Sequence, residues 1–412
     1  MRLEATNLDH LWYYLIMLFK RESITDEHKI EELLTRRIEA VFPSSEEAEK
    51  RLKEGKELRI YLGIDPTGPD LHLGHTIPLL FLKQLLVFGH KPVLLIGDFT
   101  ARIGDPTGKE SARRPLTKEE VNENMENYLE QVCKILPKGS FEIKYNSSWL
   151  SKMSFEDIIS LASHVTVQQM MARDMFQERL KNERPINIHE FLYPLMQGYD
   201  SVAMEIDGEV GGNDQTFNML VGRDLEKKLL NKDKLVFATK LLVDAESGKK
   251  MSKTEGGLIS LSDSPQDMFG KTMKTVPDEM TALVLLLCTE KPREWIEDKK
   301  IGGPYEFKKE LAFELVRMYH GEKEAEKAKD EWGRVFSKGE LPGEMEEVKN
   351  GGDIISTTVI AGIIPSKSEA KRLIDQGAVR VNGEVVETWE YTLEDGDVIQ
   401  IGPKKFLKVT SE

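Results

Sequence analysis

The sequence predicts an α/β protein built on a five-stranded parallel sheet, followed by a helical part and a small α/β part. Three observations support this prediction. From Leu58 onward, short apolar runs alternate with helical stretches, which is the pattern of a parallel sheet with crossover helices. After Gly257 the strand signals stop, and helical stretches separated by prolines follow. Beyond Asn350 a short tail again combines helix and hairpin signals.

The strands of the sheet are expected in five segments: 58–64, 92–97, 142–145, 209–212 and 236–243. A helix from Leu73 to Phe88 separates the first two and is short enough for one right-handed crossover. The stretch between Trp149 and Met204 is mostly helical and interrupts the strand rhythm. We therefore expect residues 26–257 to form a Rossmann-type nucleotide-binding domain with an insertion at 149–204.

Two more domains are expected after the sheet. Residues 258–348 should form an all-helical domain, because no strand signal interrupts them. The helices in it are separated by Pro265, Pro277, Pro292 and Pro304. Asn350-Gly351-Gly352 then predicts a flexible joint before a last domain, residues 349–412.

The tail carries clear local signals. Ser366 and Glu369 have the spacing of a helix capping box, and Gly377 is placed to end that helix. Asn382-Gly383 lies between two short apolar segments, as in a two-residue hairpin turn. A helix followed by a hairpin is therefore expected here.

Composition limits the classes of protein to consider. The 412 residues exceed what one hydrophobic core usually serves, and 40% hydrophobic with 31% charged residues is ordinary for a folded, soluble protein. The formal net charge of −14 argues against broad coating of nucleic acid or an anionic membrane. Any contact with RNA must therefore use local basic patches.

The sequence favours a reducing, cytoplasmic setting. Its two cysteines, Cys133 and Cys288, lie far apart and predict neither a disulfide framework nor a zinc site. The apolar run Leu11–Phe19 is too short to span a bilayer. Residues 1–25 are interpreted as an extension of uncertain status, either a peripheral helix or the result of a misplaced start codon. No membrane partner is expected.

A first motif, DPTGPDLHLGH at residues 65–75, leaves the first strand and opens the first helix. Helix N-termini bind anions through free backbone N–H groups and the helix dipole, so a phosphate group is the expected ligand. His72 and His75 lie on one face of the helix, and Gly74 leaves room for a flat nucleobase. Taken alone, His-x-x-His could equally bind stray metal or cap the helix.

A second motif, GKKMSKTEGG at residues 248–257, follows the last strand and carries three lysines between glycines. A lysine-rich loop alone is usually a solvated surface feature. Together, however, the two motifs resemble the paired signatures of class I aminoacyl-tRNA synthetases, here HLGH and KMSKT, in the right order on a nucleotide-binding sheet. The resemblance covers about residues 55 to 260 and implies ATP as a substrate.

Four segments resemble bacterial tyrosyl-tRNA synthetases in particular: YLGIDPT (61–67), TARIGDPTGK (100–109), YPLMQGYD (193–200) and GGNDQ (211–215). The resemblance implies catalytic roles for His72, His75, Lys250 and Lys253. It implies ATP contacts for Asp65, Gly74, Asp214 and Thr254 in addition to His72, His75 and Lys253, and pyrophosphate contacts for Lys109 and Arg113. Tyr61 and Asp200 would hold the tyrosine phenol, Asp105, Tyr193 and Gln197 its ammonium group, and Gln215 its carboxylate.

Spacing and topology agree with these roles. Tyr193, Gln197 and Asp200 fall at i, i+4 and i+7 and so share one helical face. Other predicted contact residues follow the carboxyl ends of different strands, where open α/β sheets bind ligands: Tyr61, Asp105, Gln215 and Lys253. For each residue alone, core packing or a surface charge remains an equally good interpretation.

The tail resembles an S4-type RNA-binding domain. Lys367, Lys371 and Arg372 on its helix, with Arg380 on the next strand, predict a phosphate-contacting patch. A solvated helix face is the alternative. The resemblance also implies that residues 258–348 are of the anticodon-binding type.

The implied reaction is ligation of tyrosine to tRNA(Tyr) in two steps, through tyrosyl-adenylate. L-tyrosine, ATP and tRNA(Tyr) are the expected partners, Mg²⁺ is expected to enter with ATP, no protein-bound metal is expected, and the resemblance implies a homodimer. One alternative is tryptophanyl-tRNA synthetase, whose indole substrate offers no hydroxyl for Tyr61 and Asp200. Another is a non-catalytic RNA-binding paralogue, for which the tail would suffice.

Overall fold

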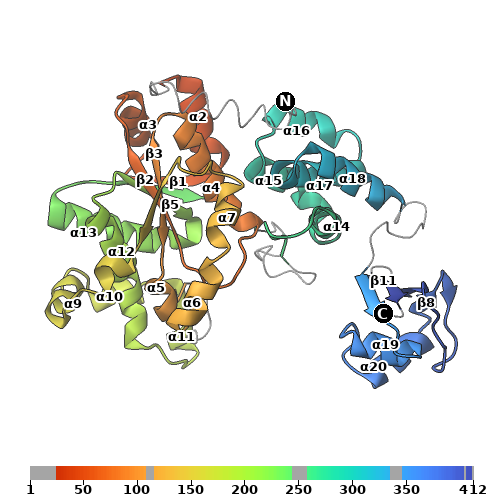
Figure 1. Cartoon of the computed structure of the whole chain (residues 1–412). Helices are drawn as coiled ribbons and strands as arrows, with labels where there is room; N and C mark the ends of the chain where they lie inside the picture. Colours follow the sequence, from red (N-terminus) through yellow and green to blue (C-terminus); the bar gives the residue numbers. More distant parts are fainter. Residues whose placement is uncertain (1–24, 108–115, 244–257, 335–345, 403–404, 411–412) are drawn as a thin grey trace, which may run out of the picture. The chain divides into compact units, whose positions relative to one another are not determined.

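The computed structural model describes residues 25–107, 116–243, 258–334, 346–402 and 405–410 (Figure 1). The chain divides into two compact units, Met1–Ala325 and Glu326–Glu412. The sheet of the first unit contains β1 (Ile38–Phe42), β2 (Arg59–Ile64), β3 (Lys91–Ile96), β4 (Glu142–Tyr145), β5 (Gly208–Gly212) and β6 (Leu235–Thr239). Its order is β1-β6-β5-β2-β3-β4.

The parallel part of this sheet confirms the predicted fold class. Strands β6, β5, β2, β3 and β4 are parallel throughout and correspond to the five predicted segments. The last of them ends at Thr239, four residues before the predicted end. The sheet has one more strand than predicted, because β1 pairs with β6 in the antiparallel direction. Its segment IEAVF is short and lies between two helices, so the alternating sheet-and-helix pattern does not include it.

Helices cover both sides of the sheet. The helices up to the insertion are α2 (Glu27–Arg36), α3 (Ser45–Lys53), α4 (Leu73–Val87), α5 (Thr100–Ile103), α6 (Lys118–Met125), α7 (Tyr128–Cys133) and α8 (Ser147–Leu150). In Figure 1, α4 and α7 lie on one side of the strands. Helix α4 is apolar nearly all round, since it contacts strands β2 and β3 with one face and another helix of the unit with the other.

The predicted helical insertion is confirmed. It contains α9 (Phe155–Ala162), α10 (Val167–Met171), α11 (Asp174–Lys181) and α12 (Ile188–Met204). The short η1 (Asn213–Gln215) and then α13 (Thr216–Leu230) follow strand β5. Helices α12 and α13 pack closely against each other on the side of the strands opposite α4 and α7 (Figure 1).

The predicted all-helical stretch is α14 (Pro265–Thr275), η3 (Asp278–Met280), α15 (Thr281–Cys288), α16 (Arg293–Lys300), α17 (Pro304–His320) and α18 (Glu322–Trp332). The four prolines lie at the starts of these elements: Pro265 and Pro304 occupy first-turn positions, and Pro277 and Pro292 are N-caps. A proline suits the first turn because its missing N–H would have no partner there.

Two buried arginines attach this helical stretch to the amino-terminal part of the sheet. The Arg36 side chain donates from Nε to the carbonyl oxygen of Leu286 at 3.0 Å. That of Arg37 donates from Nε to the carbonyl of Leu287 at 2.9 Å. Both acceptors lie in the last turn of α15, where carbonyl groups have no helical partner. These contacts join the helical stretch to the rest of the unit Met1–Ala325. That residues 258–348 form a domain of their own stays a prediction.

Helix α13 contains a buried acid, Glu226, whose two carboxylate oxygens have no hydrogen-bond partner among the described residues. Burial raises the pKa of Glu226 to about 7. The folded chain therefore binds the proton of the Glu226 carboxyl group more tightly than the unfolded chain does. The stability that this bound proton contributes is present at acidic pH and is lost as the pH rises toward 7.

Glu226→Gln should consequently gain stability over the wild type as pH rises from 5 to 8, by on the order of 1–3 kcal/mol in the free energy of unfolding. Urea unfolding of both proteins at the two pH values measures this. Glu57→Gln, at an exposed position, is the control. Parallel stability curves for Glu226→Gln and the wild type would show that Glu226 ionises normally.

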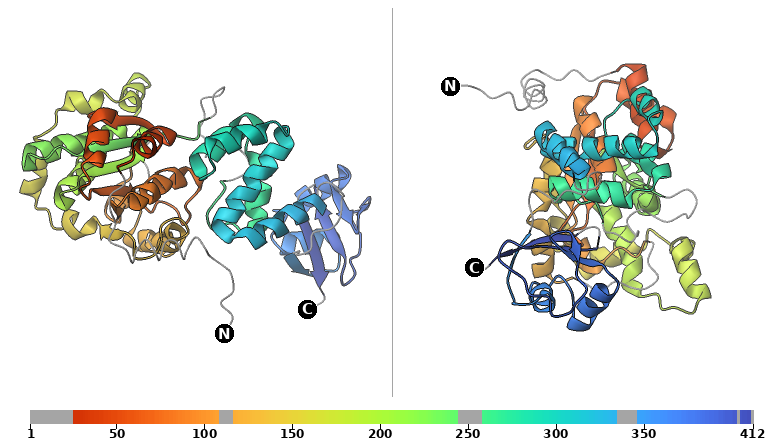
Figure 2. Two further views of the ribbon diagram at one scale, coloured as in Figure 1. Left: turned by 90° about the horizontal axis from the view of Figure 1, so that it is seen from above. Right: turned by 90° about the vertical axis from the view of Figure 1, so that its right-hand side faces the viewer.

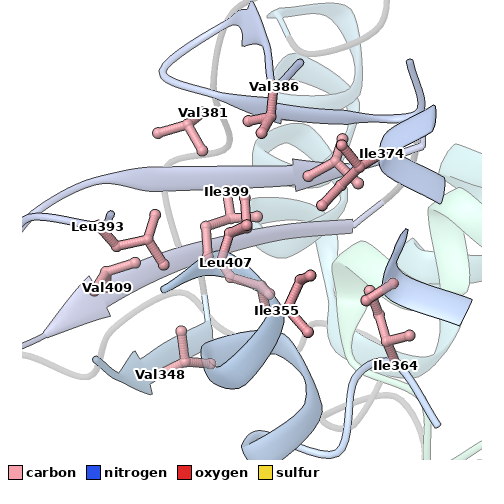
Figure 3. Packing of buried hydrophobic residues seen from close by; sticks show 13 residues of the cluster. Val348, Ile355, Ile364, Ile374, Val381, Val386, Leu393, Ile399, Leu407 and Val409 are labelled. Carbon is pink, nitrogen blue, oxygen red and sulfur yellow. The ribbon is translucent and has the colours of Figure 1, made fainter. Parts of the chain in front are cut away.

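The second unit has its own sheet and core (Figures 2 and 3). Its elements beyond α18 are β7 (Glu346–Lys349), α19 (Ile354–Ile360), α20 (Lys367–Asp375), β8 (Val379–Val381), β9 (Glu384–Val385), β10 (Val398–Ile401) and β11 (Lys405–Thr410), with sheet order β7-β11-β10-β8-β9. Figure 3 shows Ile374 of α20 and Ile355 of α19 packed with strand residues such as Ile399 and Leu407. The hairpin turn at Asn382-Gly383 is confirmed, with φ of 52° and 88°.

The predicted flexible joint is wrong. Asn350 N donates to the carbonyl of Thr410, and its side-chain amide donates to that of Leu393. Gly351 N donates to the hydroxyl of Thr357, and a Cβ at Gly351 would lie 2.9 Å from the Thr357 nitrogen. Asn350-Gly351-Gly352 is thus a tight turn inside the second unit, because tertiary partners satisfy the backbone groups that a flexible segment would expose to water.

None of the helices in the described part of the chain is long and apolar enough to cross a bilayer. The apolar run Leu11–Phe19 lies outside the described residues.

Candidate active site

A cleft of about 520 Å³ opens at the carboxyl ends of strands β2, β3, β5 and β6. Eleven of the residues predicted from the sequence line it: Tyr61, Asp65, His72, Gly74, His75, Asp105, Tyr193, Gln197, Asp200, Asp214 and Gln215. They come from five different elements or the loops after them, so the fold gathers them from widely separated positions. The volume falls within the range of small-molecule sites.

One wall of the cleft has three hydrogen-bond acceptors. Tyr193 donates its hydroxyl to Asp65 Oδ2 at 2.7 Å, which leaves the tyrosine oxygen free to accept. Gln197 donates from Nε2 to Glu209 Oε1 at 3.0 Å, which leaves its amide oxygen free to accept. With the carboxylate of Asp105, these atoms suit an ammonium group, which can only donate.

Asp105 and Gln215 meet across the cleft. Gln215 Nε2 donates to Asp105 Oδ2 at 2.7 Å, and Thr107 donates to Oδ1 from both its backbone nitrogen and its hydroxyl. An amino acid carries its ammonium and carboxylate on the same carbon. A neighbouring acceptor and donor are therefore what such a ligand requires at this end.

Asp200 also lines the cleft and is 2% exposed. Trp149 donates its indole N–H to Oδ1 at 2.8 Å, and Asn146 donates from Nδ2 to Oδ2 at 3.2 Å. Burial raises the pKa of Asp200 well above its usual value, against these two hydrogen bonds, which lower it. A buried carboxylate held in this way is a strong acceptor for a hydroxyl group.

Tyr61 is fully buried beneath the cleft, and its hydroxyl pairs with the hydroxyl of Ser201 at 3.1 Å. Burial raises the pKa of Tyr61 well above 10, so the phenol keeps its proton. Tyr61 and Asp200 both line the cleft.

His72 and His75 form the amino-terminal cap of helix α4 and line the cleft at the same time. The Nδ1 atom of His72 accepts from Gly74 N at 3.1 Å, and Nδ1 of His75 accepts from His72 N at 3.1 Å. Gly74 allows this arrangement, because a Cβ there would lie 2.9 Å from the His72 ring. The capping and functional interpretations of the motif are therefore compatible.

This cap fixes the chemical state of both imidazoles. Each Nδ1 accepts a hydrogen bond, so each ring proton sits on Nε2. Burial lowers the pKa of His72, and burial together with His72 lowers that of His75 to about 3. Both rings are thus neutral near pH 7, with Nε2–H as the donor.

Lys250, Lys253 and Thr254 of the second motif lie outside the described residues, as do Lys109 and Arg113. The residues on either side of the lysine-rich segment are described. Leu242 before it and Leu258 after it both line the cleft. The described residues that flank the segment thus lie at the cleft.

The basic residues predicted in the second unit are all exposed. Lys371 lies 4.4 Å from the centre of the Trp389 ring, and Trp389 is itself 45% exposed. Arg372 forms an ion pair with Glu369, which is weak on an exposed helix and leaves the guanidinium accessible. The described residues contain no cluster of histidine, cysteine or acidic side chains able to hold a metal ion.

Several site residues were missed at the sequence level. Asn146 directly follows β4, so the rule that ligands bind at carboxyl ends of strands could have found it. Trp149, Ser201 and Glu209 have no such local signal, because only the folded chain brings them to Asp200, Tyr61 and Gln197.

Comparison with known proteins agrees with this geometry. A family model described as tRNA synthetases class I (W and Y) matches residues 53–337, and an S4 domain model matches residues 358–399. The tyrosine–tRNA ligase of Carboxydothermus hydrogenoformans is 43% identical over 401 residues, which cover 92% of this chain and 97% of that protein. The chain belongs to the tyrosine–tRNA ligase family. The ligase of Thermotoga maritima is a second relative, 44% identical over 377 residues that cover 89% of this chain and 94% of that protein.

Solved structures of tyrosyl-tRNA synthetases share the fold of this family member. The truncated mitochondrial enzyme of Aspergillus nidulans superposes with a TM-score of 0.63 at 24% identity, covering 79% of this chain and 98% of that one. The Archaeoglobus fulgidus protein, solved with L-tyrosine, gives a TM-score of 0.57 at 22% identity, covering 73% and 99%.

The predicted ligase class is thereby confirmed, and tryptophanyl-tRNA synthetase is not favoured. The two relatives are matched along nearly their whole length, including the part that carries the cleft, and both are tyrosine–tRNA ligases.

Proposed function

We propose that this cleft binds L-tyrosine and ATP, forms tyrosyl-adenylate and transfers the tyrosyl group to tRNA(Tyr). Two groups of hydrogen-bonded side chains that line the cleft carry the proposal. Asp105, Tyr193 and Gln197 would hold the ammonium group, and Asp200 would accept the phenol hydroxyl, with Tyr61 beside it. Gln215, next to Asp105, would hold the substrate carboxylate.

The first step needs alignment more than proton transfer. The tyrosine carboxylate, already ionised at pH 7, attacks the α-phosphorus of ATP, and pyrophosphate leaves with the electrons of the broken P–O bond. Neutral His72 and His75 would donate from Nε2 to phosphate oxygens, while Lys250 and Lys253 would neutralise the charge that develops. Asp214 and Gly74 would contact the adenosine part, and Lys109 and Arg113 the pyrophosphate.

Asp65 has a further part in this arrangement. It accepts from Tyr193 and, at 2.7 Å, from the Thr100 hydroxyl, and a Cβ at Gly97 would lie 1.9 Å from its Oδ1. Its carboxylate would thus orient Tyr193 for the ammonium group as well as facing ATP.

ATP–pyrophosphate exchange tests the proposal. Exchange should depend on L-tyrosine and on Mg²⁺, which we propose enters with the phosphates of ATP, and should be far weaker with phenylalanine or tryptophan. Exchange stimulated best by tryptophan, or by no amino acid, would overturn the assignment of the cleft.

We propose that the second unit contributes to tRNA binding through Lys367, Lys371, Arg372 and Arg380. Because β7 belongs to its sheet, a truncation should remove residues 346–412 rather than start at residue 350. The truncated protein should keep tyrosine-dependent exchange but bind tRNA more weakly. The log–log salt dependence of binding should flatten by close to one unit for each lost phosphate contact. Unchanged tRNA affinity at every salt concentration would assign this unit another role.

We further propose a homodimer that pairs through the helical insertion. Phe155, Ile159, Val167, Leu180 and Ile188 on α9 to α12 are more than half exposed, and a monomer rarely leaves so many large apolar side chains uncovered. Sedimentation velocity should give twice the chain mass for the wild type, and less for Ile188→Glu. We place the protein in the cytoplasm, which cell fractionation would test.

A further inference from the structure

A lysine lies fully buried behind the proposed tyrosine site. Lys234 directly precedes β6 and is 0% exposed. Its ammonium group forms an ion pair with Glu209 Oε2 and donates to the hydroxyl of Ser201 at 2.5 Å. A fully buried lysine is rare, because removing the charge from water is costly unless it is paired and hydrogen-bonded, as Lys234 is.

Its two partners reach both ends of the tyrosine site. Glu209 accepts from Gln197, the proposed ammonium contact, and lies within hydrogen-bonding reach of the Tyr61 hydroxyl. Ser201 pairs with that same hydroxyl. Two short routes therefore start at Lys234: through Glu209 to Gln197, and through Ser201 to Tyr61.

The backbone makes room for this charge. A Cβ at Gly222 of α13 would lie 2.7 Å from Lys234 Nζ and 3.0 Å from Ser201 Oγ. Gly198 of α12 faces Gly222 in turn, with a Cβ there 3.2 Å from the Gly222 Cα. The two glycines thus let α12 and α13 approach closely beside the ammonium group.

We propose that Lys234 is a positioning residue for tyrosine recognition, acting through Glu209 on Gln197 and through Ser201 on Tyr61. This inference rests on the proposed assignment of the cleft. An ammonium group can only donate, so Ser201 must accept from Lys234 and is left to donate its own proton, with Tyr61 in reach. Tyr61 then has one proton to donate, to Glu209 or, when tyrosine is bound, to the phenol oxygen of the substrate, while the phenol hydroxyl donates to Asp200.

Loss of Lys234 disturbs both routes. Glu209 keeps a buried negative charge without its counter-ion, next to Gln197 and Tyr61 and within electrostatic reach of Asp200. The Ser201 hydroxyl can then turn, and the hydrogen-bond direction at Tyr61 is no longer fixed. His72 and His75, the proposed contacts to the phosphates of ATP, are not part of this network.

Four variants test the proposal by ATP–pyrophosphate exchange: Lys234→Met, the double variant Glu209→Gln with Lys234→Met, Ser201→Ala and, as control, Lys232→Met. Lys232 lies in the same loop and pairs with Asp207 at a partly exposed site away from the cleft. Ser201→Ala removes a single hydroxyl, so the variant should fold normally. It removes only the route from Lys234 to Tyr61. Thermal unfolding of each variant is measured in parallel.

Lys234→Met should raise the KM for tyrosine by up to about 10²-fold, with the KM for ATP and the kcat changed little. The double variant should recover much of this loss, because it removes both buried charges and keeps an acceptor for Gln197. Ser201→Ala should lower the preference for tyrosine over phenylalanine, and Lys232→Met should match the wild type.

Equal KM values for tyrosine in Lys234→Met and Lys232→Met would overturn the inference. So would a rise in the KM for ATP as large as the rise for tyrosine, combined with no recovery in the double variant. A wild-type protein that shows no tyrosine-dependent exchange would instead refute the assignment of the cleft, which separates the two failures.

Discussion

Replacing Asp200 with alanine should lower the preference for tyrosine over phenylalanine by about 10²-fold or more. A site that pairs a hydroxyl leaves buried polar groups unpaired when the hydroxyl is missing, and this penalty creates the preference. Tyrosyl-tRNA synthetases are the known example of this effect, and they prefer tyrosine over phenylalanine by about 10⁵-fold. With Asp200 gone, bound phenylalanine no longer leaves a buried carboxylate short of one hydrogen bond. Values of kcat/KM for exchange with the two amino acids measure the ratio.

Asp98→Ala is the matched control for this variant. Asp98 follows strand β3, accepts from Ser147 N and does not line the cleft. Since burial raises the pKa of Asp200, tyrosine affinity in the wild type should also fall on acidification at a higher pH than an ordinary aspartate would produce. If the preference survives in Asp200→Ala, the phenol acceptor is another residue.

His72→Asn should slow adenylate formation by about 10²–10³-fold while tyrosine binding changes little. Asparagine is among the best helix N-caps, so the variant keeps the start of α4 and loses the Nε2–H donor. Single-turnover formation of tyrosyl-adenylate gives the rate, and equilibrium dialysis gives the tyrosine affinity.

His90→Gln separates this effect from a loss of stability, because His90 is also buried but lies outside the cleft. The low pKa values of His72 and His75 add a second check, since no histidine of the pair should titrate between pH 6 and 8. If His72→Asn forms tyrosyl-adenylate at the wild-type rate, His72 only caps helix α4 and takes no part in the reaction.

Local patterns were enough to find most of the sheet. Parallel strands buried on both faces are continuous apolar runs, so β2, β3 and β6 are visible in the sequence. Strand β1 was missed because its five residues gain a partner only when β6, almost two hundred residues away, lies beside them. The turn at Asn350-Gly351-Gly352 was misjudged for the same reason: Thr410, Leu393 and Thr357 hold it, and none is a neighbour in sequence.

By itself, the sequence determined the two motifs, the strands that carry them and the residues that face the cleft. These features depend on chemistry that is local to the chain: a helix start that binds anions, one helical face, the ends of buried strands. The tertiary structure alone decided how these side chains are held. Lys234, Glu209 and Ser201 come from three separate segments of the chain, and Trp149 reaches Asp200 across 51 positions. Burial, which sets the protonation of Asp200 and His75, is likewise a property of the whole fold, because it depends on every element that excludes water from the site.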